Sequence, residues 1–98
     1  MNVENVLDEK FFDLAVRVVN YAVEFRNTAG YIPLRLVDIL KSLLELAPHI
    51  DGIQRKPFYS ETLEKIEGRD ILSSGEERAK FIDELFDLFI NEWRRTTT

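Results

Sequence analysis

Two short clusters of charged and aromatic residues are the parts of this sequence that could carry binding chemistry. The first, Arg55-Lys56-Pro57-Phe58-Tyr59, joins two cations to two aromatic rings. Cations contact phosphate backbones and aromatic rings stack on bases, so Arg55, Lys56 and Tyr59 are candidate contacts for a nucleic acid. The alternative is that the rings fold back into the core, where aromatic side chains commonly serve as anchors.

The second cluster consists of Arg35 and Asp38, just after Pro33. An arginine near the beginning of a helix opposes the helix dipole, so Arg35 indicates a specific partner. That partner is either a carboxylate of a neighbouring helix, such as Glu24, or a bound anion, because a guanidinium suits both. The sequence therefore also allows a site for a small anionic ligand at Arg35.

The segment around this second cluster carries a resemblance. Tyr31-Ile32-Pro33-Leu34-Arg35-Leu36-Val37-Asp38 resembles a motif in a small all-helical family of uncharacterised prokaryotic proteins. That family has no known activity, so the resemblance implies an all-helical fold and no particular function. It draws attention to Arg35 and Asp38.

The composition argues against an enzyme and against a bound metal or cofactor. There are no cysteines, which excludes disulfides, thiolate metal sites and a cysteine nucleophile. The single histidine, His49, has no glutamate three residues before it and no second histidine to work with. Gly-rich phosphate loops and zinc-protease or EF-hand patterns do not occur. We expect no catalytic residues, no metal and no cofactor.

The charge balance bears on partners and location. Thirteen basic and 18 acidic residues give a net charge of −5, which disfavours a nucleic-acid partner. The N-terminal residues lack the basic and apolar regions of a signal peptide, and no apolar run approaches the roughly 20 residues of a membrane span. These features predict a cytoplasmic protein that does not bind membranes.

The spacing of polar and apolar residues predicts one all-α domain over residues 1–98. Asp13, Arg17, Asn20 and Glu24 recur at steps of four, three and four, which places them on one stripe of a helix. That stripe is either a solvated face or the lining of a ligand groove. Apolar residues cover about two thirds of the circumference of this helix, far more than in an ordinary surface helix.

Capping and breaking residues set the predicted helix boundaries. Gly30 suits a helix end and Pro33 a helix start. Ser74 and Glu77 have the spacing of a capping box. The expected fold is a four-helix bundle-like domain with a short third helix and helices at about residues 5–27, 33–47, 58–67 and 75–95.

The large apolar surface of the first and fourth helices predicts assembly, because a bundle of four helices has no fully interior helix. A homodimer is the simplest way to bury the surplus, and another protein partner is the alternative. The candidate interface residues are Phe12, Val16, Val19, Val23, Phe81, Phe89 and Trp93. The function that the sequence favours is a non-enzymatic oligomerising or adaptor domain. The alternatives are a nucleic-acid-associated regulator using the Arg55-Lys56 loop and an anion binder at Arg35.

Overall fold

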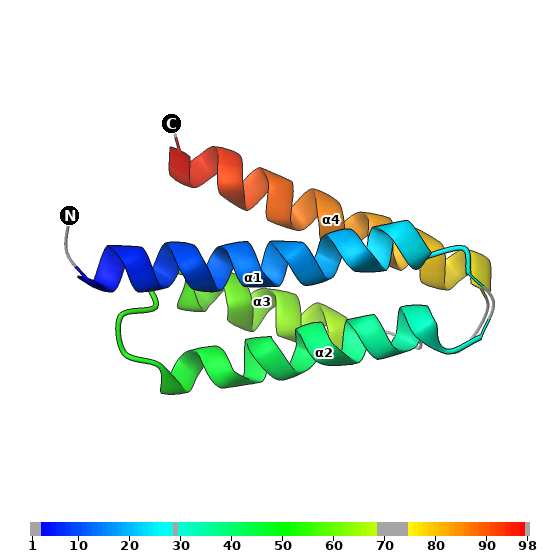
Figure 1. Cartoon of the computed structure of the whole chain (residues 1–98), viewed down its shortest axis with the longest axis horizontal. Coiled ribbons are helices and arrows are strands. Elements are labelled where there is room, and N and C mark those ends of the chain that lie inside the picture. The colour runs from blue at the N-terminus through cyan, green and yellow to red at the C-terminus, as the bar shows by residue number, and fades with distance from the viewer. Residues whose placement is uncertain (1–2, 29, 69–74, 98) are drawn as a thin grey trace.

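Four antiparallel α-helices pack around one core in the computed structural model, which describes residues 3–28, 30–68 and 75–97 (Figure 1). The helices are α1 (Val3–Phe25), α2 (Ile32–Leu46), α3 (Lys56–Glu67) and α4 (Gly75–Thr97), with a 3-10 turn η1 (Ala47–His49) after α2. The molecule measures 44 × 25 × 18 Å. This arrangement confirms the prediction of an all-α bundle with a short third helix.

The first two helices form a long hairpin whose turn follows from local sequence. α1 ends at Phe25, two residues before the predicted end, and the backbone N–H of Thr28 bonds to the Phe25 carbonyl at 2.9 Å. Gly30 has φ of +91°, a left-handed conformation that costs glycine little. Pro33 then lies in the first turn of α2, where its missing N–H costs no hydrogen bond.

The proline residues also shape the chain on both sides of the loop before α3. Pro48 lies within η1, a tighter 3-10 turn that follows directly after α2. Pro57 lies in the first turn of α3, so this helix begins at Lys56, two residues earlier than predicted. At the other end, the backbone N–H of Gly68 bonds to the Glu64 carbonyl at 2.9 Å.

α4 extends two residues beyond its predicted end at residue 95. The hydroxyl of Thr96 donates to the Glu92 carbonyl at 3.0 Å, which keeps the last turn hydrogen-bonded. Ser74, the first residue of the predicted capping box, lies outside the described residues.

The core is rich in aromatic side chains from three of the four helices. Phe12 and Phe89 have ring centroids 5.7 Å apart, and Phe58 meets Phe89 edge to face at 4.9 Å. Tyr59 contacts Phe11 edge to face at 5.2 Å. Such geometries add to the stabilisation from burial alone. The cluster joins α1, α3 and α4 at one end of the bundle.

The polar stripe predicted on α1 lies on its outer surface. Asp13, Arg17, Asn20 and Glu24 are all exposed. No helix within the described residues combines the length and apolar character that crossing a membrane requires.

Two isoleucines on α4 provide a test of this core. Ile82 is fully buried and Ile90 is only partly covered. Replacing Ile82 with alanine should lower the free energy of unfolding by about 3 kcal/mol, because the apolar contact is lost and a cavity remains. Ile90→Ala should cost about 1 kcal/mol, since less area leaves the core. Urea denaturation measures both, and equal losses would contradict the packing.

Candidate interaction surface

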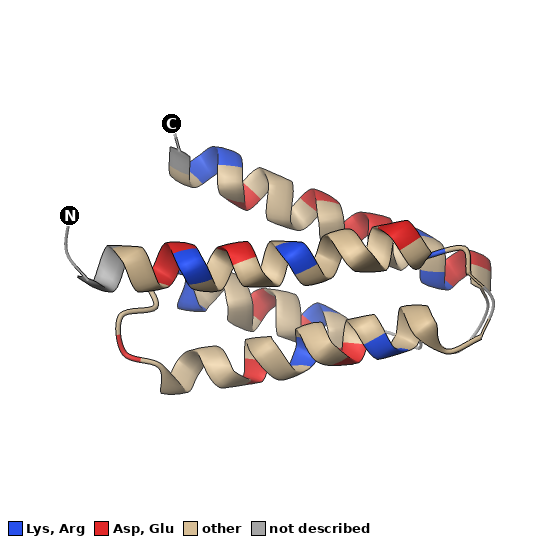
Figure 2. Ribbon diagram, viewed as in Figure 1, with Lys and Arg blue, Asp and Glu red and all other residues tan. Residues whose placement is uncertain are grey.

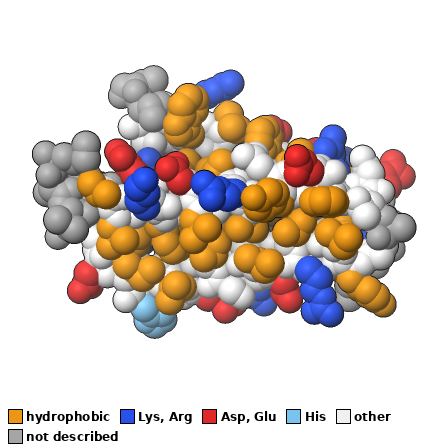
Figure 3. Space-filling view, viewed as in Figure 1, with side chains coloured by type: hydrophobic (Ala, Val, Ile, Leu, Met, Phe, Trp, Pro, Cys, Tyr) orange, Lys and Arg blue, Asp and Glu red, His pale blue; other side chains and the backbone are white. Residues whose placement is uncertain are grey.

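One side of the α1–α2 hairpin is unusually apolar. Ten large apolar side chains are exposed among the described residues, and seven of them lie along these two helices on one face. We call this set the α1–α2 face: Leu7, Leu14, Tyr21 and Phe25 on α1, and Ile32, Ile39 and Leu46 on α2. Figure 3 shows apolar side chains gathered over the front of the hairpin. The apolar side chains of α1 and α2 thus adjoin one another and form one surface.

The α1–α2 face arises from a seven-residue recurrence on each helix. Leu7, Leu14 and Tyr21 follow one another at seven-residue steps, as do Ile32, Ile39 and Leu46. Residues seven apart on an α-helix lie almost above one another, so each set forms a stripe along its helix. Each stripe flanks residues that pack into the bundle core, such as Val18 on α1 and Leu40 on α2. The hairpin is therefore apolar on two sides, one facing the core and one facing outward.

The exposed fraction of these side chains makes the surface large for a chain of this size. The seven side chains are between 38% and 51% exposed. Large apolar side chains have roughly 150–250 Å² each to bury, so together they leave on the order of 600 Å² in water. The largest apolar patch on a typical monomer reaches roughly 300–600 Å² and is often functional. The face is thus at the upper end of what a soluble monomer shows.

Charged residues of both signs border the α1–α2 face (Figure 2). α1 carries Lys10, Arg17 and Glu24 on its exposed side. α2 carries Arg35, Asp38 and Glu45 on its exposed side. With Asp13, which is exposed on the same stripe of α1, the border carries three positive and four negative charges, while the whole chain has a net charge of −5.

The interface residues predicted from sequence lie elsewhere. Six of the seven serve the chain's own core: Phe12, Val19, Phe81 and Phe89 are buried, and Val16 and Val23 are partly buried against them. A side chain covered within its own chain has little surface left for a partner. Trp93 is 52% exposed, but it lies on α4, apart from the α1–α2 face. The sequence identified amphipathic helices without showing which apolar residues the monomer would cover.

Arg35 and Asp38 are both exposed near the start of α2. None of the pockets described below includes either residue in its wall. The structure therefore places them on the border of the α1–α2 face.

Arg55 is held inside the molecule by groups from α1 and α4. Its Nη1 donates to Asp8 Oδ2 at 2.7 Å, and its Nη2 donates to the Thr96 hydroxyl at 2.9 Å. The guanidinium carbon lies 4.3 Å from the centroid of the Phe12 ring, a cation–π contact. The Arg55 and Asp8 side chains are only 12% and 8% exposed. Arg55 therefore connects the loop before α3 to α1 and α4.

Asp8 completes this arrangement from the α1 side. Its Oδ1 accepts a hydrogen bond from the backbone N–H of Gln54 at 2.8 Å and a longer one from that of Arg55 at 3.4 Å. A buried carboxylate bonded to backbone N–H groups and a guanidinium keeps its charge satisfied. Asp8 could not be recognised as a functional residue from sequence, because its hydrogen-bond partners lie more than 40 residues away.

Tyr59 lies beneath the Arg55–Asp8 pair with only 1% of its surface exposed. Its hydroxyl makes no hydrogen bond of standard geometry with the described residues. Burial and the nearby Asp8 carboxylate raise the pKa of Tyr59 well above its ordinary value near 10, and the Arg55 charge offsets part of this rise. A ring in this position is unable to stack on a nucleic-acid base.

The fold therefore leaves little of the predicted nucleic-acid contacts accessible to a nucleic acid. Arg55 is paired, Tyr59 is buried, and Lys56, at the start of α3, is partly buried. A cleft of about 290 Å³ opens beside Arg55, with Asp8, Thr96 and Arg95 among its lining residues. Asp8, Arg55 and Thr96 are already bonded to one another, and Arg95 bonds to the buried Glu92 at 2.7 Å. Arg55, Asp8 and Thr96 thus bond to one another and stabilise the fold.

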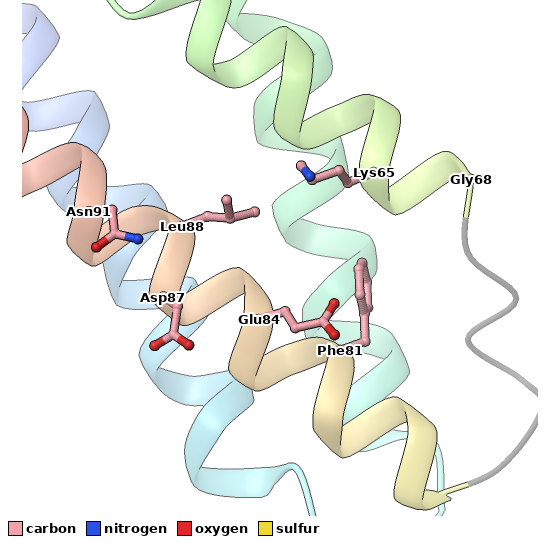
Figure 4. A pocket seen from close by; sticks show the side chains of 7 residues that line it. All are labelled: Lys65, Gly68, Phe81, Glu84, Asp87, Leu88 and Asn91. Carbon is pink, nitrogen blue, oxygen red and sulfur yellow. The ribbon is translucent and has the colours of Figure 1, made fainter.

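Two further clefts lie in the described part of the molecule, one between α3 and α4 and one at the turn end. Figure 4 shows the first, of about 540 Å³, with Lys65 on α3 and Phe81 and Leu88 on α4 extending into it. The second, of about 440 Å³, lies among Arg26, Thr28 and the first turn of α4. No group of three or more histidine, aspartate or glutamate side chains in the described part of the chain could hold a metal ion.

Comparisons with known proteins identify no relative. No family model, curated protein or solved structure matches the chain. The function must therefore be argued from the surface described above.

The Arg55–Asp8 pair can be tested against an exposed ion pair of the same chain. Arg55→Met should lower the free energy of unfolding by about 3 kcal/mol, because Asp8 would remain buried without its partner. Lys41 and Glu45 form an exposed pair at 3.9 Å, so Lys41→Met should cost at most about 0.5 kcal/mol. Urea denaturation at pH 7 compares the two variants. A loss from Arg55→Met as small as that from Lys41→Met would show that the pair does not hold the loop.

Tyr59 makes the stability of the protein sensitive to alkaline pH. Because the folded state holds the hydroxyl proton more tightly than the unfolded state does, this contribution is complete below pH 10. Above that pH, it should fall by about 1.4 kcal/mol per pH unit.

Tyr59→Phe should remove this alkaline loss and change stability at pH 7 by less than about 1 kcal/mol, since the hydroxyl makes no standard hydrogen bond. Denaturation at pH 7 and at high pH measures the difference between the variant and the natural protein. A difference that does not change with pH would contradict the burial of a neutral phenol.

Proposed function

We propose that this protein is a non-enzymatic, self-associating domain that forms homodimers by burying the α1–α2 face against a second copy. The single observation that carries the proposal is the row of seven exposed apolar side chains on one face of one hairpin. Burying apolar area is the main driving force of protein association. Any role of the protein then depends on bringing two copies together.

The area of the face supports an association between two copies. On the order of 600 Å² per chain amounts to about 1,200 Å² for a pair, which is the lower end of specific protein interfaces. Interfaces near this lower end are commonly weak and reversible, so we expect a dissociation constant on the order of micromolar. The dimer should therefore form at ordinary laboratory concentrations and dissociate on dilution.

The charge around the face supports a second copy over a differently charged partner. Three positive and four negative residues border it, so two like faces meet with little net repulsion. α4, which lies apart from this face, carries Glu76, Glu77, Asp83 and Asp87 among its acidic residues. Self-association through the α1–α2 face keeps these acidic groups in water.

Light scattering during size-exclusion chromatography tests the proposal. The natural protein should have about twice the chain mass of 11.5 kDa at concentrations well above the micromolar range. The variant carrying Leu14→Glu and Ile39→Glu should be a monomer, because two charges would be desolvated in each face. Circular dichroism shows whether this variant keeps its helical fold.

Trp93→Glu is the matched control, because Trp93 is as exposed as Ile39 but lies on α4. This variant should keep the mass of the dimer. A natural protein that is monomeric at hundreds of micromolar would overturn the proposal. A dimer dissociated by Trp93→Glu and not by the double variant would move the interface to α4.

A further inference from the structure

Resting on the proposed dimer, we infer that α1 of each copy packs antiparallel on α2 of the other, about a two-fold axis parallel to the helices. The inference follows from the heights of apolar and charged residues along the hairpin. Both copies then point the same way, and all four chain ends lie at one end of the assembly.

The hairpin fixes which residues share a height. Phe25 ends α1 and Ile32 begins α2 across a short turn, at the same end of the molecule (Figure 1). Each residue rises by about 1.5 Å along both helices. Ile39 therefore falls about midway between Leu14 and Tyr21. By the same geometry, Leu46 falls about midway between Leu7 and Leu14.

A rotation about an axis parallel to the helices preserves these heights. The partner's Ile39 would then enter the gap between Leu14 and Tyr21. The partner's Leu46 would enter the gap between Leu7 and Leu14. This interdigitation resembles the knobs-into-holes packing of coiled coils, and the seven-residue recurrence maintains it along the whole face. The same contacts are made twice, as two-fold symmetry requires.

The charged border agrees with the same arrangement. Arg17 and Asp38 fall within about 3 Å of the same height, as do Lys10 and Glu45. Glu24 and Arg35 form a third such pair within about 3 Å, with the signs reversed. Packing α1 on the partner's α2 thus sets opposite charges at similar heights three times, while Asp13 falls within about 2 Å of the height of the partner's Glu45.

The competing arrangement has the two-fold axis across the helices. α1 would then pack antiparallel on the partner's α1. Centred on the stripe from Leu7 to Phe25, this packing places the two Arg17 side chains beside the axis and beside each other. Like charges in this position oppose association. The same register also sets Lys10 near the height of the partner's Glu24, so the apolar interdigitation, rather than charge, favours α1 on the partner's α2.

Single-cysteine variants distinguish the two arrangements, because the chain contains no cysteine of its own. Arg17 on α1 and Ile39 on α2 are both exposed and lie at nearly the same height along the hairpin. With one cysteine per chain, any disulfide must join two chains. The two Cα atoms must approach within about 7 Å for the bond to form.

An equimolar mixture of Arg17→Cys and Ile39→Cys should give a covalent dimer on mild oxidation, seen by non-reducing electrophoresis. Each variant oxidised alone should give little. Light scattering under reducing conditions first establishes that each variant retains the dimer mass. Strong crosslinking of Arg17→Cys by itself would overturn the inference in favour of α1 on the partner's α1.

A charge exchange gives an independent measurement. Arg17→Glu should weaken dimerisation roughly tenfold, and adding Asp38→Arg should restore it, because the pair is rebuilt with reversed signs. Failure of restoration would contradict the pairing. A dimer without the mixed crosslink overturns this arrangement and leaves the proposed function standing, whereas a natural protein that is always monomeric overturns both.

Discussion

A bundle of four helices covers only one side of each helix, and this constraint governs the whole molecule. α1 and α2 contribute buried residues such as Val19 and Leu40 to the core and still carry a second apolar stripe on the outside. No element of the described chain is left to cover that stripe. The same hairpin that builds the core therefore also supplies a surface suited to association.

Charge is used in two contrasting ways in this fold. At one end, Arg55 and Asp8 are buried together and connect the loop before α3 to α1 and α4. Around the α1–α2 face, charged residues remain in water and are nearly balanced in sign. The first arrangement fixes the chain internally, since an unpaired buried charge is costly. The second has little effect on stability, because exposed charges interact weakly, but in the proposed dimer it would orient the second copy.

Much of the fold was predictable because local rules decide it. Helical periodicity, the position of Pro33 and the termination at Gly68 predicted four helices to within a few residues of their observed ends. The errors in the predicted helix ends involve single residues that the periodicity does not reveal. Pro57 lies in the first turn of α3, which begins earlier than expected, and α4 continues past the Thr96 hydroxyl, which bonds to the Glu92 carbonyl. Among the candidate functional residues, Arg55 and Tyr59 were recognisable by type, but their pairing and burial were not.

The sequence by itself determined which side of each helix is polar, since the step pattern of Asp13, Arg17 and Glu24 admits only one stripe. It also indicated that the first and fourth helices carry more apolar surface than one contact can cover. Only the tertiary structure decided which apolar residues stay outside, because coverage depends on how neighbouring helices pack. Phe12 and Leu14 are two residues apart and both apolar, yet one is buried against α4 and the other is 46% exposed.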